Sequence, residues 1–221
     1  MGALTQSALD FLRDLSNNNN KDWFTSHKSR FEKDLKKPFE QWIGELIQAF
    51  HAIDPAIMIK PQDAIFRIYR DTRFSQDKRP YKEHMAAVIS PYGRKQMEYP
   101  GFYVHLESGM LMLGGGAYFL EKPALEKVRR HIMAEPDKFQ GLVQAPEFVE
   151  KYGELRGERN KILPVEFRDA EKEIPLIANK QFYYMAELPA ENAITPDSVQ
   201  RVTNYFQAAR PFNDFLVEAL T

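Results

Sequence analysis

The chain has 221 residues, of which 43% are hydrophobic and 28% are charged, proportions that are typical of globular proteins and exclude a disordered or low-complexity chain. Thirty Lys and Arg residues against 31 Asp and Glu residues give a formal net charge of −1, which excludes a generally basic nucleic-acid-binding surface but not a local basic patch. The chain has no cysteine, no signal-peptide pattern and no run of about 20 apolar residues, so we expect a cytoplasmic protein without disulfides or a membrane partner.

The first quarter of the chain carries apolar residues at helical spacing. Residues 4–15 predict one helix, which ends in a run of four asparagines. The last asparagine of that run can cap a second helix over residues 21–35. Pro38 then interrupts this helix or begins a third one, whose apolar stripe reaches Phe50. We therefore expect residues 1–55 to be helical.

The pattern changes in the next part of the chain, residues 57–120, which we expect to be rich in strands. Residues 64–69 (AIFRIY) alternate like a strand, with Phe66 and Ile68 on one face and Ile65, Arg67 and Tyr69 on the other. Residues 85–90 predict a second strand. Residues 102–107 and 110–113 flank a Ser-Gly pair and predict a tight hairpin.

The last part of the chain, residues 121–221, predicts mixed, mainly helical structure. A helix is expected to begin near Pro123, and shorter helices should follow it. Residues 181–188 alternate like a strand. The sequence Thr195-Pro-Asp is a strong helix start, because it offers a cap, a first-turn proline and an acid at the positive end of the helix dipole. We expect this last helix to break or bend at Pro211.

The order of these elements predicts the fold class. Helices come first, strands are grouped in the middle, and helices follow. This order favours an α+β fold with a central antiparallel sheet and with N-terminal and C-terminal helices packed on it. A doubly wound parallel sheet is less favoured, because strands and helices do not alternate regularly. No internal repeat or long linker divides the chain, so we expect one domain over residues 1–221.

One segment, residues 67–82 (RIYRDTRFSQDKRPYK), concentrates positive charge and has a net charge of +4. Arginine binds phosphate and carboxylate through two parallel hydrogen bonds, and lysine adds a compact charge. Aromatic residues between the cations could exclude water or stack on a base. We therefore expect an anionic small molecule or a nucleic-acid phosphate as the partner. The expected ligand-binding residues are Arg67, Arg70, Arg73, Lys78, Tyr81 and Lys82.

The same segment resembles the signature of an uncharacterised family of mainly bacterial proteins, the domain of unknown function numbered 2461. That signature can be written R-x-x-R-D-x-R-F-x-x-D-K-x-P-Y-K. Ten residues fall on its specified positions: Arg67, Arg70, Asp71, Arg73, Phe74, Asp77, Lys78, Pro80, Tyr81 and Lys82. Residues 19–28 and 101–105 are similar to the family's N-terminal and central patterns. The resemblance supports the location of the site but implies no activity.

Two other interpretations of the segment stay open. In the first, Asp71 and Asp77 form ion pairs with the cations and fix a structural junction in an interaction protein. In the second, the protein is an enzyme that acts on a phosphorylated or carboxylated small molecule. Asp71 or His84 would then be the general base and Tyr81 the general acid. Because His84 lies two residues beyond Lys82, its pKa should be lowered and its ring neutral.

The sequence predicts neither a metal nor a cofactor. The chain has no His-x-His or His-x-x-x-His pair, and its five histidines are scattered: His27, His51, His84, His105 and His131. Residues 114–119 begin like a dinucleotide-binding loop but have Phe where the last glycine belongs. The three glycines there favour a hairpin exit or close backbone packing, and less strongly a set of N–H groups for an anion before a helix.

Overall fold

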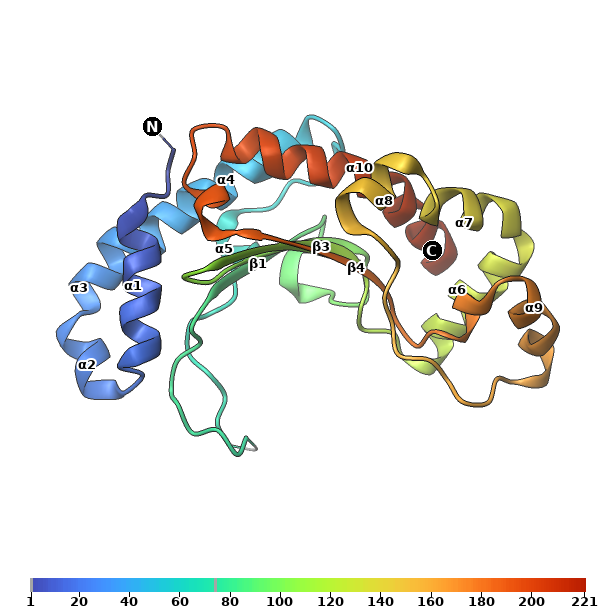
Figure 1. The fold of residues 1–221 in the computed structure, drawn as a ribbon, viewed down its shortest axis with the longest axis horizontal. Helices are drawn as coiled ribbons and strands as arrows, with labels where there is room; N and C mark the ends of the chain where they lie inside the picture. The colour runs from blue at the N-terminus through green and yellow to red at the C-terminus, as the bar shows by residue number, and fades with distance from the viewer. Residues whose placement is uncertain (1, 74) are drawn as a thin grey trace. The chain divides into compact units, whose positions relative to one another are not determined.

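A computed structural model describes residues 2–73 and 75–221, and Figure 1 shows the order of their elements. Phe74, which is part of the signature, lies outside the described residues. None of the helices in the described part of the chain combines the length and apolar character needed to cross a bilayer.

The chain divides into two compact units that interleave in sequence. Unit 1 comprises the residues up to Lys95 together with Tyr103–Leu113 and Glu187–Asn204. Unit 2 comprises Gln96–Phe102, Gly114–Ala186 and Tyr205–Thr221. The expectation of a single domain over residues 1–221 stays a prediction.

The protein has an α+β fold with one antiparallel sheet of four strands, as the order of the sequence elements predicts. The strands are β1 (Met85–Ile89), β2 (Gly101–Leu106), β3 (Met110–Ala117) and β4 (Phe182–Pro189). Their order in the sheet is the same as their order in the chain. Strands β2 and β3 form the predicted hairpin, and a long, mainly helical segment separates β3 from β4.

Unit 1 begins with a series of helices, of which all but the shortest bury apolar residues. They are α1 (Gln6–Asn17), α2 (Lys21–Ser26), α3 (Lys28–Arg30), the π-helix η1 (Phe31–Lys36) and α4 (Lys37–His51). The Asn20 side chain caps α2 by accepting the Trp23 N–H at 2.9 Å. The predicted second helix is thus divided at His27. Trp42 is fully buried in α4 and donates its indole N–H to Ser198 at 3.1 Å, which satisfies its polar atom.

The predicted strand over residues 64–69 is wrong as a regular strand. Ala64 ends the short helix α5 (Pro61–Ala64). The residues after it are extended, but they make only isolated antiparallel bridges, one from Ile65 to Ala87 and one from Tyr69 to Tyr81. The alternation in the sequence therefore indicates an extended backbone at the edge of the sheet, but not a strand with continuous hydrogen bonding to its neighbour.

The three glycines at 114–116 lie inside β3 and not in a loop before a helix. A Cβ atom on Gly115 would lie 2.4 Å from the Gly101 carbonyl oxygen and 2.4 Å from the Tyr184 hydroxyl. Gly116 has a φ of +93°, a conformation that other residues rarely adopt. These glycines permit close backbone packing, as one sequence interpretation expected, and their place inside a strand removes the idea of an anion site before a helix.

Unit 2 buries several aromatic residues around the C-terminal helix, among them Phe139, Phe148 and Tyr184. The helices after β3 are α6 (Lys122–Ala134), α7 (Pro136–Val143), α8 (Pro146–Tyr152), α9 (Arg168–Glu173) and α10 (Ser198–Leu220). Short 3-10 turns are η2 (Gly93–Lys95), η3 (Val165–Phe167), η4 (Pro175–Ala178) and η5 (Ala190–Ala193). Pro211 does not break α10, which runs through it, and the alternative of a bend at this residue stays a prediction. Buried Tyr184 donates its hydroxyl to Asn213 at 3.1 Å.

Candidate functional site

The signature segment forms an extended arm, defined here as residues 69–73 and 75–81, which leaves the edge of the sheet and returns to it (teal in Figure 1). Its two ends pair in antiparallel fashion through the bridge between Tyr69 and Tyr81. Immediately beyond that bridge, the Lys82 N–H donates to the Ile68 carbonyl at 2.7 Å. The start and end of the signature are therefore held side by side at the base of the arm.

Within the arm, Asp77 joins two cations. Its carboxylate accepts hydrogen bonds from the guanidinium groups of Arg70 and Arg79. Arg79 also forms an ion pair with Glu83. The hydrogen bonds from Arg79 and Arg70 hold the pKa of the Asp77 carboxyl well below its usual range. Asp77 is therefore ionised and fully engaged as an acceptor.

A second pair lies nearer the tip of the arm. Arg73 donates to the two carboxylate oxygens of Asp71 at 3.0 and 2.7 Å, and these bonds lower the pKa of Asp71 to about 2. The Lys78 ammonium donates to the Thr72 carbonyl at 2.9 Å. Three residues predicted to bind the ligand, Arg70, Arg73 and Lys78, thus already have acceptors within the arm. The structural interpretation of the segment describes this part of it well.

Tyr81 lies at the base of the arm and is only 5% exposed. Its ring stacks on Phe24 at a centroid distance of 4.0 Å. Its backbone N–H donates to the Asn19 side-chain oxygen at 3.1 Å, and the Asn19 amide donates back to the Tyr81 carbonyl at 3.0 Å. Burial raises the pKa of the Tyr81 hydroxyl, which makes this residue a poor general acid. The geometry gives Tyr81 an anchoring role.

Beside the base of the arm, unit 1 has an open pocket of about 610 Å³, which we call the basic pocket. Its lining includes five cationic and two acidic side chains, together with aromatic rings from Phe66 and Tyr69. The five cations are Lys28, Lys36, Arg67, Lys82 and Arg94. The basic pocket therefore has an excess of cations, of which the signature supplies only Arg67 and Lys82.

The cations of the basic pocket differ in their partners. Lys36 forms an ion pair with Glu32 at 3.0 Å, and Arg94 donates to a backbone carbonyl. In contrast, no carboxylate of residues 2–73 or 75–221 lies within ion-pair distance of Lys28, Arg67 or Lys82. These three cations are the ones that an anion could bind without displacing a protein partner.

Among these three cations, Lys82 lies against an aromatic ring and near another positive charge. Its ammonium lies 5.2 Å from the centre of the Phe66 ring, which provides a cation–π contact. Burial and, second, the like charge of Arg67 lower the pKa of Lys82. A negative ligand beside these two cations would act in the opposite direction, because an opposite charge favours the ammonium form of Lys82.

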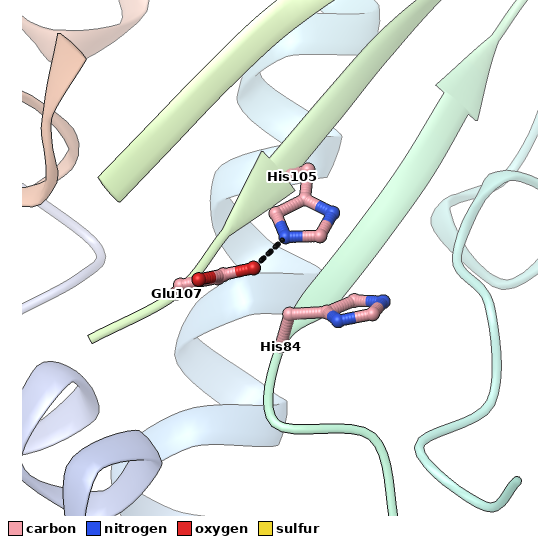
Figure 2. A group of neighbouring side chains, drawn as sticks. All are labelled: His84, His105 and Glu107. Carbon is pink, nitrogen blue, oxygen red and sulfur yellow. Dashed lines mark hydrogen bonds and ion pairs between the residues drawn. The ribbon is translucent and has the colours of Figure 1, made fainter. Parts of the chain in front are cut away.

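Lys82 also lines a second open pocket of about 470 Å³, which we call the histidine pocket. Asp71, His84 and Glu107 contribute to its wall. The His84 ring stacks on the ring of buried His105 at a centroid distance of 4.0 Å, with 26° between the ring planes (Figure 2). Ligand atoms of His84, His105 and Glu107 all lie within 4.8 Å of one another.

Both ring nitrogens of His105 have partners. Nε2 lies 2.8 Å from a carboxylate oxygen of Glu107, and Nδ1 lies 2.8 Å from the Tyr103 hydroxyl. Because a carboxylate only accepts, a neutral His105 ring donates Nε2–H to Glu107 and accepts the Tyr103 hydroxyl proton at Nδ1. Burial raises the pKa of Tyr103 to about 12, which keeps this hydroxyl protonated.

Both histidine rings are neutral near pH 7. Burial, the neighbouring His105 and the Lys82 charge lower the pKa of His84 to about 3, in the direction that the sequence predicted. Burial also lowers the pKa of His105, against the opposing effect of Glu107. A ring with so low a pKa is a weak base. The Asp71 carboxylate already accepts hydrogen bonds from Arg73. This geometry therefore gives no support to Asp71 or His84 as a general base.

Comparison with known proteins places the chain in a family. A family described as "Conserved hypothetical protein (DUF2461)" matches residues 7–215. The chain belongs to this family. It has no match among curated proteins and none among solved structures.

The cluster around His105 was missed at the sequence level. Tyr103, His105 and Glu107 are alternate residues along and just beyond β2, so their side chains lie on one face of the sheet. That Tyr-x-His-x-Glu alternation is the signal that could have found them, and its first part overlaps the family's central pattern. Their proximity to His84 depends on the pairing of β1 with β2, which spacing alone does not reveal.

Proposed function

We propose that the protein binds an anionic small molecule, carrying phosphate or carboxylate, in the basic pocket. The observation that carries the proposal is the pair of Arg67 and Lys82. These residues approach from opposite ends of the signature, line the same pocket and lack a carboxylate partner among the described residues. Burial and, second, the like charge of Arg67 lower the pKa of Lys82, which supports a site where a negative ligand would be favoured.

The shape and lining of the pocket favour a small ligand over a nucleic-acid backbone. Its volume of about 610 Å³ is in the range of small-molecule sites, which span roughly 300–1,000 Å³. Arg67 can bind a phosphate through two hydrogen bonds, while Lys82 contributes a point charge. The Phe66 and Tyr69 rings give an apolar or aromatic part of the ligand a surface to pack on. A phosphorylated compound with a flat or apolar portion is thus the best fit.

Thermal-shift and calorimetric titrations test this proposal. The compounds would be nucleoside monophosphates and triphosphates, pyrophosphate, citrate and a short oligonucleotide, each at low and high salt. We expect stabilisation by at least one small anion, weaker at high salt because its contacts are ionic. Arg67→Gln and Lys82→Met should each weaken the binding of that compound by about tenfold or more, since one hydrogen bond to a charged group contributes about 1.5–3 kcal/mol.

Arg73→Gln is the matched control, because Arg73 belongs to the same signature but is bonded to Asp71 in the arm. It should bind the anion as the wild-type protein does. Equal losses in all three variants would mean that the whole segment acts only by its net charge. No stabilisation by any of these anions at low salt would refute the proposal.

A further inference from the structure

We infer that His84, His105 and Glu107 form a binding site for a divalent transition metal at the wall of the histidine pocket. The inference concerns a different group of side chains from the anion site and does not rest on the proposed function. Two imidazoles and one carboxylate are a ligand set that Zn²⁺ and Fe²⁺ both accept. Among the described residues, this is the group of three potential ligands whose donor atoms lie close enough to share an ion.

The distances suit such an ion. A tetrahedral metal with bonds of about 2.0–2.2 Å holds its ligand atoms about 3.3–3.6 Å apart. The His105 Nε2 to Glu107 distance of 2.8 Å is shorter than that, and the full set of ligand atoms lies within 4.8 Å. A metal would therefore separate Glu107 from His105 slightly and draw the His84 ring towards them. Because an imidazole nitrogen binds a metal in the plane of its ring, the stacked His84 ring would also have to rotate to point a nitrogen at the ion.

The His105 ring, the first of the three ligands, has a hydrogen bond on the ring nitrogen that would not bind the metal. Metal-binding histidines usually have a second hydrogen bond on the other ring nitrogen, which fixes the ring and its tautomer. Tyr103 supplies it here, at 2.8 Å from Nδ1. With a metal bound at Nε2, the neutral His105 ring carries its proton on Nδ1. This N–H then donates a hydrogen bond to the Tyr103 oxygen. The hydroxyl group suits either tautomer, because it both donates and accepts.

The other two ligands have the freedom that metal binding requires. His84 makes no hydrogen bond to another residue in the described ranges through its ring nitrogens, so a metal would displace no protein partner there. The Glu107 side chain is 40% exposed. Both line the open histidine pocket, so a metal held by the three side chains would keep a coordination position facing that pocket. This open position is the feature that distinguishes a reactive metal site from a closed structural one.

The experiment uses full-length protein without a histidine tag. After chelator treatment and dialysis, Zn²⁺ is titrated by calorimetry, and Co²⁺ is added as a spectroscopic probe of coordination geometry. We expect one equivalent of Zn²⁺ per chain and Co²⁺ absorption bands of a four- or five-coordinate site. His84→Gln and Glu107→Gln should each weaken Zn²⁺ binding by about 100-fold. Tyr103→Phe, which removes only the supporting hydroxyl, should weaken it by about 10-fold.

His51→Gln is the control, because His51 lies outside the cluster and bonds a backbone carbonyl. It should leave Zn²⁺ binding unchanged. Glu107→Gln and His84→Gln alter partly exposed side chains, and circular dichroism spectra would check that both variants fold. Absence of stoichiometric binding to the wild-type protein would overturn the inference. Equal affinity in folded His84→Gln, Glu107→Gln and wild-type proteins would overturn it as well.

Discussion

The arm and the basic pocket both contain cations from residues 67–82, but these cations differ in whether they have carboxylate partners. In the arm, Arg70, Arg73 and Arg79 each have a carboxylate partner within a few residues along the chain. In the basic pocket, Arg67 and Lys82 have none among the residues that the structure describes. The comparison shows that a local excess of positive charge does not locate a binding site by itself. We propose that the part of this excess without a carboxylate partner among the described residues marks the site.

The first way to test this comparison is to remove the apolar anchor of the arm. Tyr81→Ala should lower the free energy of unfolding by about 3–5 kcal/mol, because it deletes a buried ring stacked on Phe24. Tyr69→Ala, at a ring that is 49% exposed, should cost much less. Chemical denaturation measures both values. Similar losses for the two variants would mean that Tyr81 is not the anchor.

The second prediction concerns stability without a ligand. Lys82→Met should leave the free energy of unfolding unchanged or raise it by up to about 1 kcal/mol, because it removes a half-buried charge that lies near Arg67 and lacks a carboxylate partner in the described ranges. Chemical denaturation in a buffer without polyvalent anions measures this. A clear loss of stability would show that Lys82 is part of a satisfied network, like the arginines of the arm.

The third prediction concerns the order of the arm. Asp77→Asn removes the charge that joins Arg70 to Arg79, so the arm should open more often and trypsin should cleave within it several-fold faster. The matched change Asp71→Asn affects a pair near the tip in which Arg73 is 77% exposed, and it should have a smaller effect. Mass spectrometry of the first tryptic fragments distinguishes the two. Equal rates would show that Asp77 does not hold the arm.

The smallest effect is a pH dependence of the same arm. Arginine partners lower the pKa of Asp71 from 3.8 to about 2 and lower that of Asp77 as well. A lowered pKa in the folded state stabilises the fold above the ordinary value, and this contribution is lost as the pH falls through the lowered one. The arm should therefore stay ordered at pH 4 and loosen towards pH 2, as carboxyl NMR titrations would show. An Asp71 midpoint near 3.8 would contradict this.

The sequence predicted the elements that local patterns determine and missed those that depend on distant partners. The helix over residues 6–17 and strand β1 follow from apolar spacing, which the core then buries. The alternation after Ala64 was misleading, because extended residues form a strand only if a neighbour pairs with them continuously. The helix through Pro211 likewise continues where a local rule predicts a break.

The same distinction applies to the candidate site. Residues 67–82 stood out through charge, and the structure places Arg67 and Lys82 of that segment in the basic pocket. Which arginines are paired could not be predicted, because that depends on how the arm folds back on itself. His105 and Glu107 could not be joined to His84 without knowledge of the sheet order.

The contact between Asn19 and Tyr81 has a consequence for how the protein folds. The Asn19 amide bonds both polar groups of the Tyr81 backbone, as a neighbouring strand would, across 62 residues of chain. Closing so long a loop is entropically costly and slow compared with forming a helix. We therefore expect the base of the signature to become ordered after the first helices have formed, so that both pockets are completed only at that step.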